Sequence, residues 1–175
     1  IVIKPVWTAN KYIITFVDDN GDVIEAAKEV EFGSSIVAPA DPEKDGYNFA
    51  YWIDKDTGAV MPATMPAKNA TYVAYYTAGD DTTYYIEVYT MDVDGEYTMT
   101  AQTVATGTTG ERIAVTPGAL NGYTYDASLS VLTGVITADG KAALKVYYAR
   151  DLYTVTFNSG DGVFEDDATV VGPTN

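Results

Sequence analysis

One long pattern occurs three times along this sequence, and the repetition limits how the chain can fold. Each copy opens on an aromatic strand that runs into a Gly turn: Tyr12–Phe16 before Asp19-Asn20-Gly21, Tyr85–Tyr89 before Asp94-Gly95, and Tyr153–Phe157 before Gly160-Asp161-Gly162. The opening tyrosines at positions 12, 85 and 153 are 73 and 68 residues apart. A period of this length corresponds to a whole small domain. The sequence therefore predicts a tandem array of small modules.

The side-chain composition predicts that these modules are mainly β. The 175 residues include 15 tyrosines, and Tyr, Thr and Val fill the segments between turns, as they do in half-buried strands. Each complete copy closes on a second aromatic strand, Val73–Tyr76 or Val146–Tyr148. We expect the closing strand to lie beside the opening one, as in a β-grasp. The expected fold class is mainly β, a β-grasp-like α+β fold with little helix, in an elongated array.

Turn residues divide each module into expected strands. The strongest short hairpin signal is Asn20-Gly21. For the first module we expect strands at Tyr12–Val17, Val23–Phe32, Tyr47–Ile53 and Thr71–Tyr76. For the second we expect strands at Tyr84–Met91, Tyr97–Val104, Tyr123–Val131, Gly134–Thr137 and Ala142–Tyr148. A single helical turn is expected at Glu111–Val115, before the break at Thr116-Pro117-Gly118.

Short polar linkers separate the modules. We expect residues 1–8 to be the last strand of a preceding repeat, residues 9–80 and 81–150 to be two complete modules, and residues 151–175 to be the first hairpin of a following repeat. The linker that contains Gly79 should be the softest joint. Because unpaired strands invite pairing, we expect head-to-tail contacts between chains through the two partial repeats.

Charge and composition exclude several classes of function. The formal net charge is −15, from 25 acidic and 10 basic residues, whereas nucleic acids and anionic membranes attract basic surfaces. The chain has no His and no Cys, so Ser-His-Asp and Cys-His catalytic sets are excluded. Paired carboxylates for glycoside hydrolysis stay open, but a module of this size has little room for a deep cleft. We therefore expect that the chain is not an enzyme, does not bind nucleic acid and does not insert into a membrane.

Two sets of residues are candidates for binding. Asp18, Asn20 and Asp22 have the alternate spacing that begins a calcium loop. Position 23 is Val where that loop has Gly, so an exposed hairpin turn is the favoured interpretation; calcium is the only cofactor considered. Trp52, Tyr51 and Trp7 could contact a ligand such as a glycan, although packing in a core or an interface is favoured because the rings sit in strand patterns.

Short motifs run through both modules. The first module contains Tyr12-x-x-Thr-Phe16, Asp19-Asn20-Gly21, Val30-Glu31-Phe32-Gly33, Asp45-Gly46-Tyr47-x-Phe49-Ala50-x-Trp52 and Val73-x-Tyr75-Tyr76. In these motifs it resembles the internalin-type B repeat of bacterial surface proteins. The second module contains Gly107-Thr-Thr-Gly110, Gly122-Tyr-Thr-Tyr125, Ser128-Leu-Ser130, Gly134 and Ala138-Asp-Gly140-x-x-x-Leu144-x-Val146-Tyr-Tyr148. In these it is similar to mucin-binding-protein-like repeats.

These resemblances imply a place and a role. They imply a β-grasp-like module of a secreted, wall-attached protein on the surface of a Gram-positive bacterium, used as a stalk or an adhesion repeat. The partners implied are neighbouring repeats and a host-surface protein or glycan, and tandem units would multiply weak contacts. No catalytic residues come with either family. The alternative function is a glycan-binding accessory module of a surface enzyme.

Overall fold

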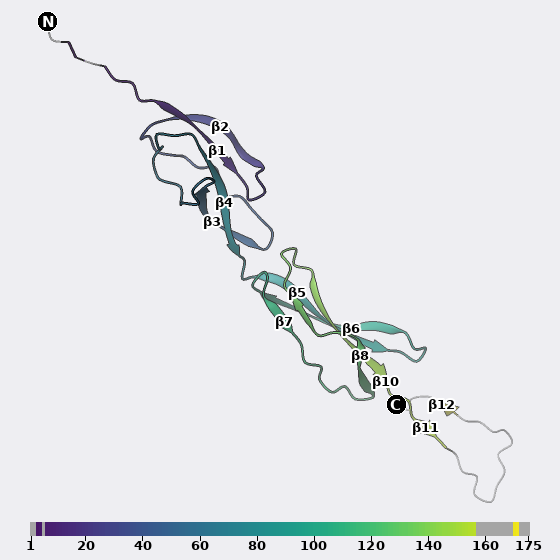
Figure 1. Cartoon of the computed structure of the whole chain (residues 1–175). Coiled ribbons are helices and arrows are strands. Elements are labelled where there is room, and N and C mark those ends of the chain that lie inside the picture. Colours follow the sequence, from purple (N-terminus) through teal and green to yellow (C-terminus); the bar gives the residue numbers. More distant parts are fainter. Residues whose placement is uncertain (1–2, 5, 157–169, 172–175) are drawn as a thin grey trace, which may run out of the picture. The chain divides into compact units, whose positions relative to one another are not determined.

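The computed structural model describes residues 3–4, 6–156 and 170–171 (Figure 1). The chain divides into two compact units, Ile1–Gly79 and Asp80–Asn175. All regular structure within the described residues is β-strand, which confirms the prediction of a mainly β fold. No helix in this part of the chain is long and apolar enough to cross a membrane.

The first unit is a four-stranded mixed sheet. Its strands are β1 (Lys11–Val17), β2 (Val23–Glu31), β3 (Tyr47–Asp54) and β4 (Ala70–Ala78), in the order β2-β1-β4-β3. Strands β1 and β2 form an antiparallel hairpin, and β3 and β4 form another. The first and last strands, β1 and β4, run parallel in the centre of the sheet. The expected pairing of opening and closing strands is therefore confirmed for this unit.

The second unit repeats this topology. Its main strands are β5 (Thr82–Met91), β6 (Tyr97–Gly107), β8 (Tyr123–Val131) and β10 (Ala142–Arg150), in the order β6-β5-β10-β8. Again the opening strand β5 and the closing strand β10 are parallel neighbours. A separate two-stranded sheet joins β7 (Arg112–Ala114) to β9 (Thr133–Val135).

The helical turn expected at Glu111–Val115 is wrong. This segment contains β7, in which Ile113 lies opposite Gly134 of β9. The partner strand lies about 20 residues further along the chain, so the local sequence carries no sign of the pairing. A Cβ atom at Gly134 would come within 3.1 Å of the Leu144 side chain, which explains why a residue without a side chain stands there.

The two partial repeats are described only in part. The strands β11 (Thr154–Val155) and β12 (Val170–Val171) pair antiparallel, while the expected turn around Asp161 lies outside the described residues. Residues 3–4 and 6–10 form no strand. The assignment of residues 1–8 to a preceding repeat stays a prediction, since its pairing partner would belong to another segment.

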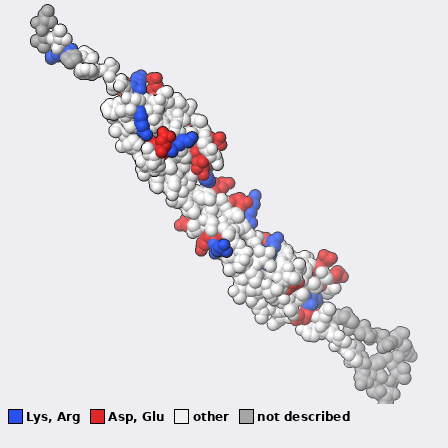
Figure 2. Space-filling view, viewed as in Figure 1, with Lys and Arg blue, Asp and Glu red and all other residues white. Residues whose placement is uncertain are grey.

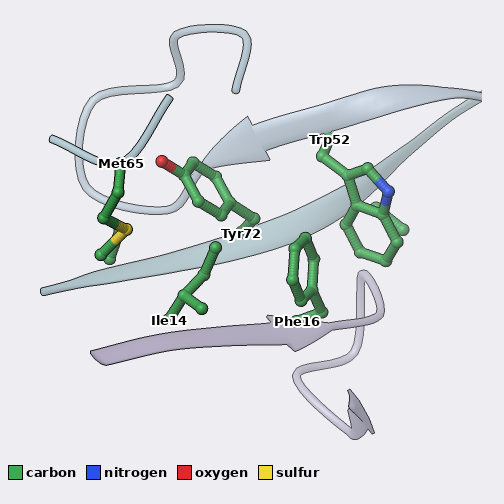
Figure 3. Packing of buried hydrophobic residues seen from close by; sticks show 7 residues of the cluster. Ile14, Phe16, Trp52, Met65 and Tyr72 are labelled. Carbon is green, nitrogen blue, oxygen red and sulfur yellow. The ribbon is translucent and has the colours of Figure 1, made fainter. Parts of the chain in front are cut away.

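An aromatic core holds the first unit together (Figure 3). Phe16 of β1 meets Trp52 of β3 edge to face, with ring centroids 4.9 Å apart, and lies 5.8 Å from the ring of Tyr72 of β4. Met65 covers the same face from the connector between β3 and β4 and is 1% exposed. Its backbone is fixed by hydrogen bonds with Ser34 and Gly33.

The core of the second unit is more aliphatic. It contains Leu144, Val146 and Tyr148, which are alternate residues of β10, together with Ile136 from the segment after β9. The alternation places Lys145 and Tyr147 on the other face of the sheet. Each unit therefore has one sheet face that packs in a core and one that stays open.

Candidate functional site: the open sheet faces

The open face of the second unit carries a row of polar and aromatic side chains. In the parallel register, Lys145 lies opposite Glu87 and Tyr147 opposite Tyr89. Residues directly opposite on one face interact, and here they do so in two ways. The rings of Tyr89 and Tyr147 stack with centroids 4.6 Å apart and planes 10° from parallel. Lys145 Nζ lies 3.9 Å from Glu87 Oε2 and 5.8 Å from the centre of the Tyr89 ring.

Hydrogen bonds extend this row to both edges of the sheet. The Tyr89 hydroxyl donates to Glu87 Oε2 at 2.8 Å, and the Tyr97 hydroxyl of β6 donates to Asp126 Oδ2 of β8 at 3.0 Å. Tyr97 also meets the Tyr147 ring edge to face at 5.2 Å. All four strands of the main sheet thus contribute to one connected surface, the open face of unit two.

Hydrogen bonds and burial shift the pKa values of three groups on this surface. The hydrogen bond to Glu87, followed by burial, raises the pKa of Tyr89. Burial, followed by the bond to Asp126, raises the pKa of Tyr97. Hydrogen bonds from Ser128 and then from Tyr97 lower the pKa of Asp126. The hydroxyls of Tyr89 and Tyr97 are therefore engaged as donors to carboxylates on the same face.

The aromatic contacts leave little of a sugar-stacking platform. A sugar ring packs on a free aromatic face, and the stacking of Tyr89 on Tyr147 already occupies one face of each ring. In the first unit Tyr51 and Tyr75 stack in the same way, with centroids 5.0 Å apart and planes 13° from parallel. On both open faces the tyrosines form cross-strand pairs, which stabilise a sheet.

The three aromatic residues that the sequence proposed as ligand contacts are not brought together. Trp52 is 4% exposed and belongs to the core. Its ring therefore packs against protein, as the favoured interpretation from the sequence predicted. Tyr51 is 42% exposed on the open face. Trp7 is 87% exposed and precedes the first strand.

The calcium candidates form a hairpin turn whose ligand oxygens are used within the turn. Asp18 Oδ1 accepts hydrogen bonds from the amides of Asn20 and Asp22 at 2.9 and 2.7 Å, and Oδ2 accepts one from Asn20 Nδ2 at 3.3 Å. Burial raises the pKa of Asp18, but the bonds from Asp22, Asn20 and Gly21 together outweigh it, and the net shift is downward. Within the described residues, no three acidic, His or Cys side chains come together as a metal site would require.

The second unit builds the same turn from different residues. Asp92 Oδ1 accepts from the amides of Asp94 and Glu96, both at 2.9 Å. Gly21 and Gly95 occupy the same place in their turns with positive φ angles of 96° and 88°. The shared spacing Asp-x-x-Gly-acid is therefore the signature of a self-bonded hairpin turn.

A cavity in the first unit was not foreseen from the sequence. It has a volume of about 350 Å³ and is lined by Asp19, Lys44, Tyr47, Ala74, Tyr75 and Tyr76. Lys44 pairs with Asp19, and its Nζ lies 4.8 and 5.2 Å from the ring centres of Tyr47 and Tyr76. The bond to Asp19 raises the pKa of Lys44. An internal ammonium thus already fills the aromatic site that a foreign cation would need, and only the fold brings residues 19 and 44 together.

The surface charge is mixed in sign. On the face seen in Figure 2, Lys and Arg lie beside Asp and Glu, with wide uncharged areas between these small groups.

Comparison with known proteins identifies the first unit. Internalin H of Listeria monocytogenes is 35% identical over 79 residues, which are 43% of this chain and 14% of that protein. A protein of Evansella cellulosilytica whose name describes a Gly-rich membrane protein is 39% identical over 46 residues, 26% of this chain and 5% of that one. The chain thus spans a small part of the relatives that it matches.

A solved structure is also similar to this chain. The structure titled "Crystal structure of Mub-RV" is similar at 16% identity and a TM-score of 0.25, over 81% of this chain and 98% of that one. Residues 12–85, which span most of the first unit, match the Listeria-Bacteroides repeat domain, in agreement with the resemblance of this module to internalin-type repeats.

Proposed function

We propose that this chain is a non-catalytic repeat segment of a secreted, wall-attached bacterial surface protein, where it acts as a stalk or spacer and contributes to adhesion to a host-surface protein or glycan. The match of residues 12–85 to a repeat domain supports a repeat role. The similarity to Internalin H supports a place on a bacterial surface. The adhesive partner belongs to this proposal alone.

The parallel pairing of opening and closing strands is the observation that carries the spacer role. In the first unit Ile14–Val17 lie beside Ala70–Val73, and in the second Tyr84–Thr90 lie beside Ala142–Tyr148. The chain enters each unit through one of these strands and leaves through the other. A force that pulls the two ends apart therefore acts along the paired strands, and it must shear the whole row of hydrogen bonds at once. A module with this topology suits a segment that holds another domain away from a wall.

The use made of the acidic groups supports a role without catalysis. Asp18 and Asp139 accept hydrogen bonds from backbone amides of their own turns, and Asp126 accepts one from the Ser128 amide within β8. Asp54 accepts from the amides of Asp56 and Thr57 and from Lys68 Nζ. These carboxylates are structural acceptors with lowered pKa values, which suits turns and not proton transfer.

Pulling single molecules from both ends tests the spacer role. If the chain bears load as proposed, each unit unfolds in one abrupt step, because rupture in shear breaks the paired strands together. Forced unfolding is governed by the unfolding rate, so the step force reports this barrier directly. Gradual extension at low force, without abrupt steps, would refute the spacer role.

A further inference from the structure

The outer edge of β6 is free of hydrogen bonds within the described residues. The inner edge pairs with β5, with Ala101–Gly107 opposite Thr82–Val88 in unbroken register. The backbone of β6 makes no other backbone hydrogen bond in the part of the chain that the structure describes. In such a strand every second residue directs its N–H and C=O groups outward. The edge is therefore a template for one more strand.

This edge lacks the devices that protect the two edges of the first sheet. Strand β2 carries Glu25, Lys28, Glu29 and Glu31. The outer side of β3 is covered by the following connector, where the Met61 amide donates to the Trp52 carbonyl and Val60 bridges to Ile53. Strand β6 contains neither a charged residue nor Pro over its whole length. Its one interruption is a register shift next to Thr100, which leaves Ala101–Gly107 regular.

The side chains beside this edge favour an uncharged strand. Val104 and Gln102 lie opposite Tyr85 and Glu87, so both stand on the open face of unit two. Val104 is 61% exposed and Met99 is 51% exposed. An added strand would place alternate side chains next to them, and small or β-branched apolar residues would bury this exposed surface.

The charges beside β6 select the flanks of the partner. Asp92, Asp94 and Glu96 precede the strand, Glu111 and Arg112 follow it, and residues 82–110 contain no Lys or Arg. A second copy of this chain, paired antiparallel through the same edge, would bring the acidic turn of one chain near Glu111 and Arg112 of the other, whose charges cancel and leave the three acids of the turn unbalanced. Lys or Arg residues beside an uncharged strand would complement those acids.

We propose that the β6 edge binds an extended segment of a partner protein by strand addition. The segment has an uncharged centre with alternating apolar residues and basic residues at its ends. Backbone hydrogen bonds supply affinity, and the flanking charges and the surface around Val104 supply selectivity. The inference does not rest on the spacer role, so a failure of either test leaves the other standing.

Binding of a synthetic peptide to the full chain tests this proposal. The probe is a labelled peptide Lys-Lys-Thr-Val-Thr-Val-Thr-Lys-Lys, compared with the same centre flanked by Asp. We expect saturable binding of the Lys-flanked peptide, weakened by salt, and no binding of the Asp-flanked one. Hydrogen exchange should then slow at alternate amides of Ala101–Gly107. Equal binding of both peptides, or protection confined to another segment, would overturn the proposal.

Matched variants locate the site. Val104→Lys places a charge on the edge and should weaken binding by about tenfold or more. Val60→Lys adds the same charge at an equally exposed valine, 61%, in unit one, and should leave the affinity unchanged. Asp94→Asn with Glu96→Gln should weaken binding about twofold to fivefold at low salt. If both Lys variants bind alike, the edge is not the site. If the chain alone forms a dimer that Val104→Lys dissociates, the occupant is a second copy and the proposed partner is wrong.

Discussion

Two buried tyrosines differ in how their hydroxyl groups are accommodated in the two cores. Tyr72 is 0% exposed, and its hydroxyl has no hydrogen-bond partner among the described residues. Tyr148 is 6% exposed, but its hydroxyl donates to the Gly118 carbonyl at 2.7 Å. An unpaired buried hydroxyl costs stability, whereas a paired one contributes about 0.5–1.5 kcal/mol.

Removing each hydroxyl should therefore have opposite consequences. We expect Tyr72→Phe to leave the free energy of unfolding of the first unit unchanged or raised, because it removes an unsatisfied group. Tyr148→Phe should lower that of the second unit by about 1 kcal/mol. Denaturant titrations of both variants measure the two values. A loss in Tyr72→Phe as large as that in Tyr148→Phe would contradict the account.

The buried carboxylate Asp54 makes the first unit sensitive to acid. The hydrogen bond from Lys68, at 2.8 Å, and those from Thr57 and Asp56 lower the pKa of Asp54 despite its burial. A carboxyl whose pKa is lower in the folded state stabilises that state above its unfolded pKa, about 3.9. This contribution is lost as the pH falls through the folded pKa.

Asp54→Asn should thus flatten the loss of stability below about pH 4. The measurement is the denaturant midpoint of the first unit at neutral pH and at a series of acidic pH values. Asp56→Asn, which changes an exposed neighbour in the same turn, is the control and should keep the pH dependence of the parent chain. An unaltered acid dependence in Asp54→Asn would show that another group is responsible.

The first hairpin of each unit depends on a turn in which an Asp side chain accepts hydrogen bonds from backbone amides of the same turn. Gly95 has a φ of 88° with open space around it, while Gly118 has open space and no positive φ. Ala at position 95 would therefore be strained by its backbone and not by a clash.

This difference predicts unequal effects of the same substitution. Gly95→Ala should destabilise the second unit by about 1 kcal/mol. Gly118→Ala should leave its stability unchanged or slightly raised, because Ala restricts the unfolded chain. Thermal unfolding of the two variants decides between backbone strain and mere loss of a glycine; equal effects would contradict the conformational explanation.

The elements that the sequence predicts well are those with local signals. Asn20-Gly21 and Asp94-Gly95 mark the two hairpins, and the aromatic strands mark the parallel neighbours in each sheet. The strand β7 escaped prediction because three residues carry no periodicity and their partner is distant. The pairing of β1 with β2 also has register shifts next to Phe16, which a sequence pattern does not reveal.

The candidate site was less predictable than the fold. The sequence marked Tyr51 and Trp52 as possible ligand contacts but did not assign them to opposite faces of β3. Tyr51 stacks on Tyr75, whereas Trp52 lies in the core. The row formed by Glu87, Tyr89 and Tyr147 depends on the register between β5 and β10, which only the assembled sheet defines. The positions of the turns could be predicted from the sequence, but the side-chain contacts between strands could not.

The main feature of the whole molecule is that both units repeat one topology, in which the opening and closing strands pair in parallel. The paired row is longer in the second unit, seven residue pairs from Tyr84 to Thr90 against four from Ile14 to Val17 in the first. Since a row in shear breaks as a whole, the longer row should resist more force. The proposed spacer role therefore predicts that the two modules unfold at unequal forces.

End-to-end pulling of single molecules tests this central claim most directly. The account predicts two abrupt unfolding steps, the weaker from unit one and the stronger from unit two. Leu144→Ala, which opens the core under β10, should lower only the stronger step, and Ile14→Ala should lower only the weaker one. A single gradual extension, or a stronger step that Ile14→Ala lowers and Leu144→Ala leaves unchanged, would contradict the claim that the parallel strands bear the load.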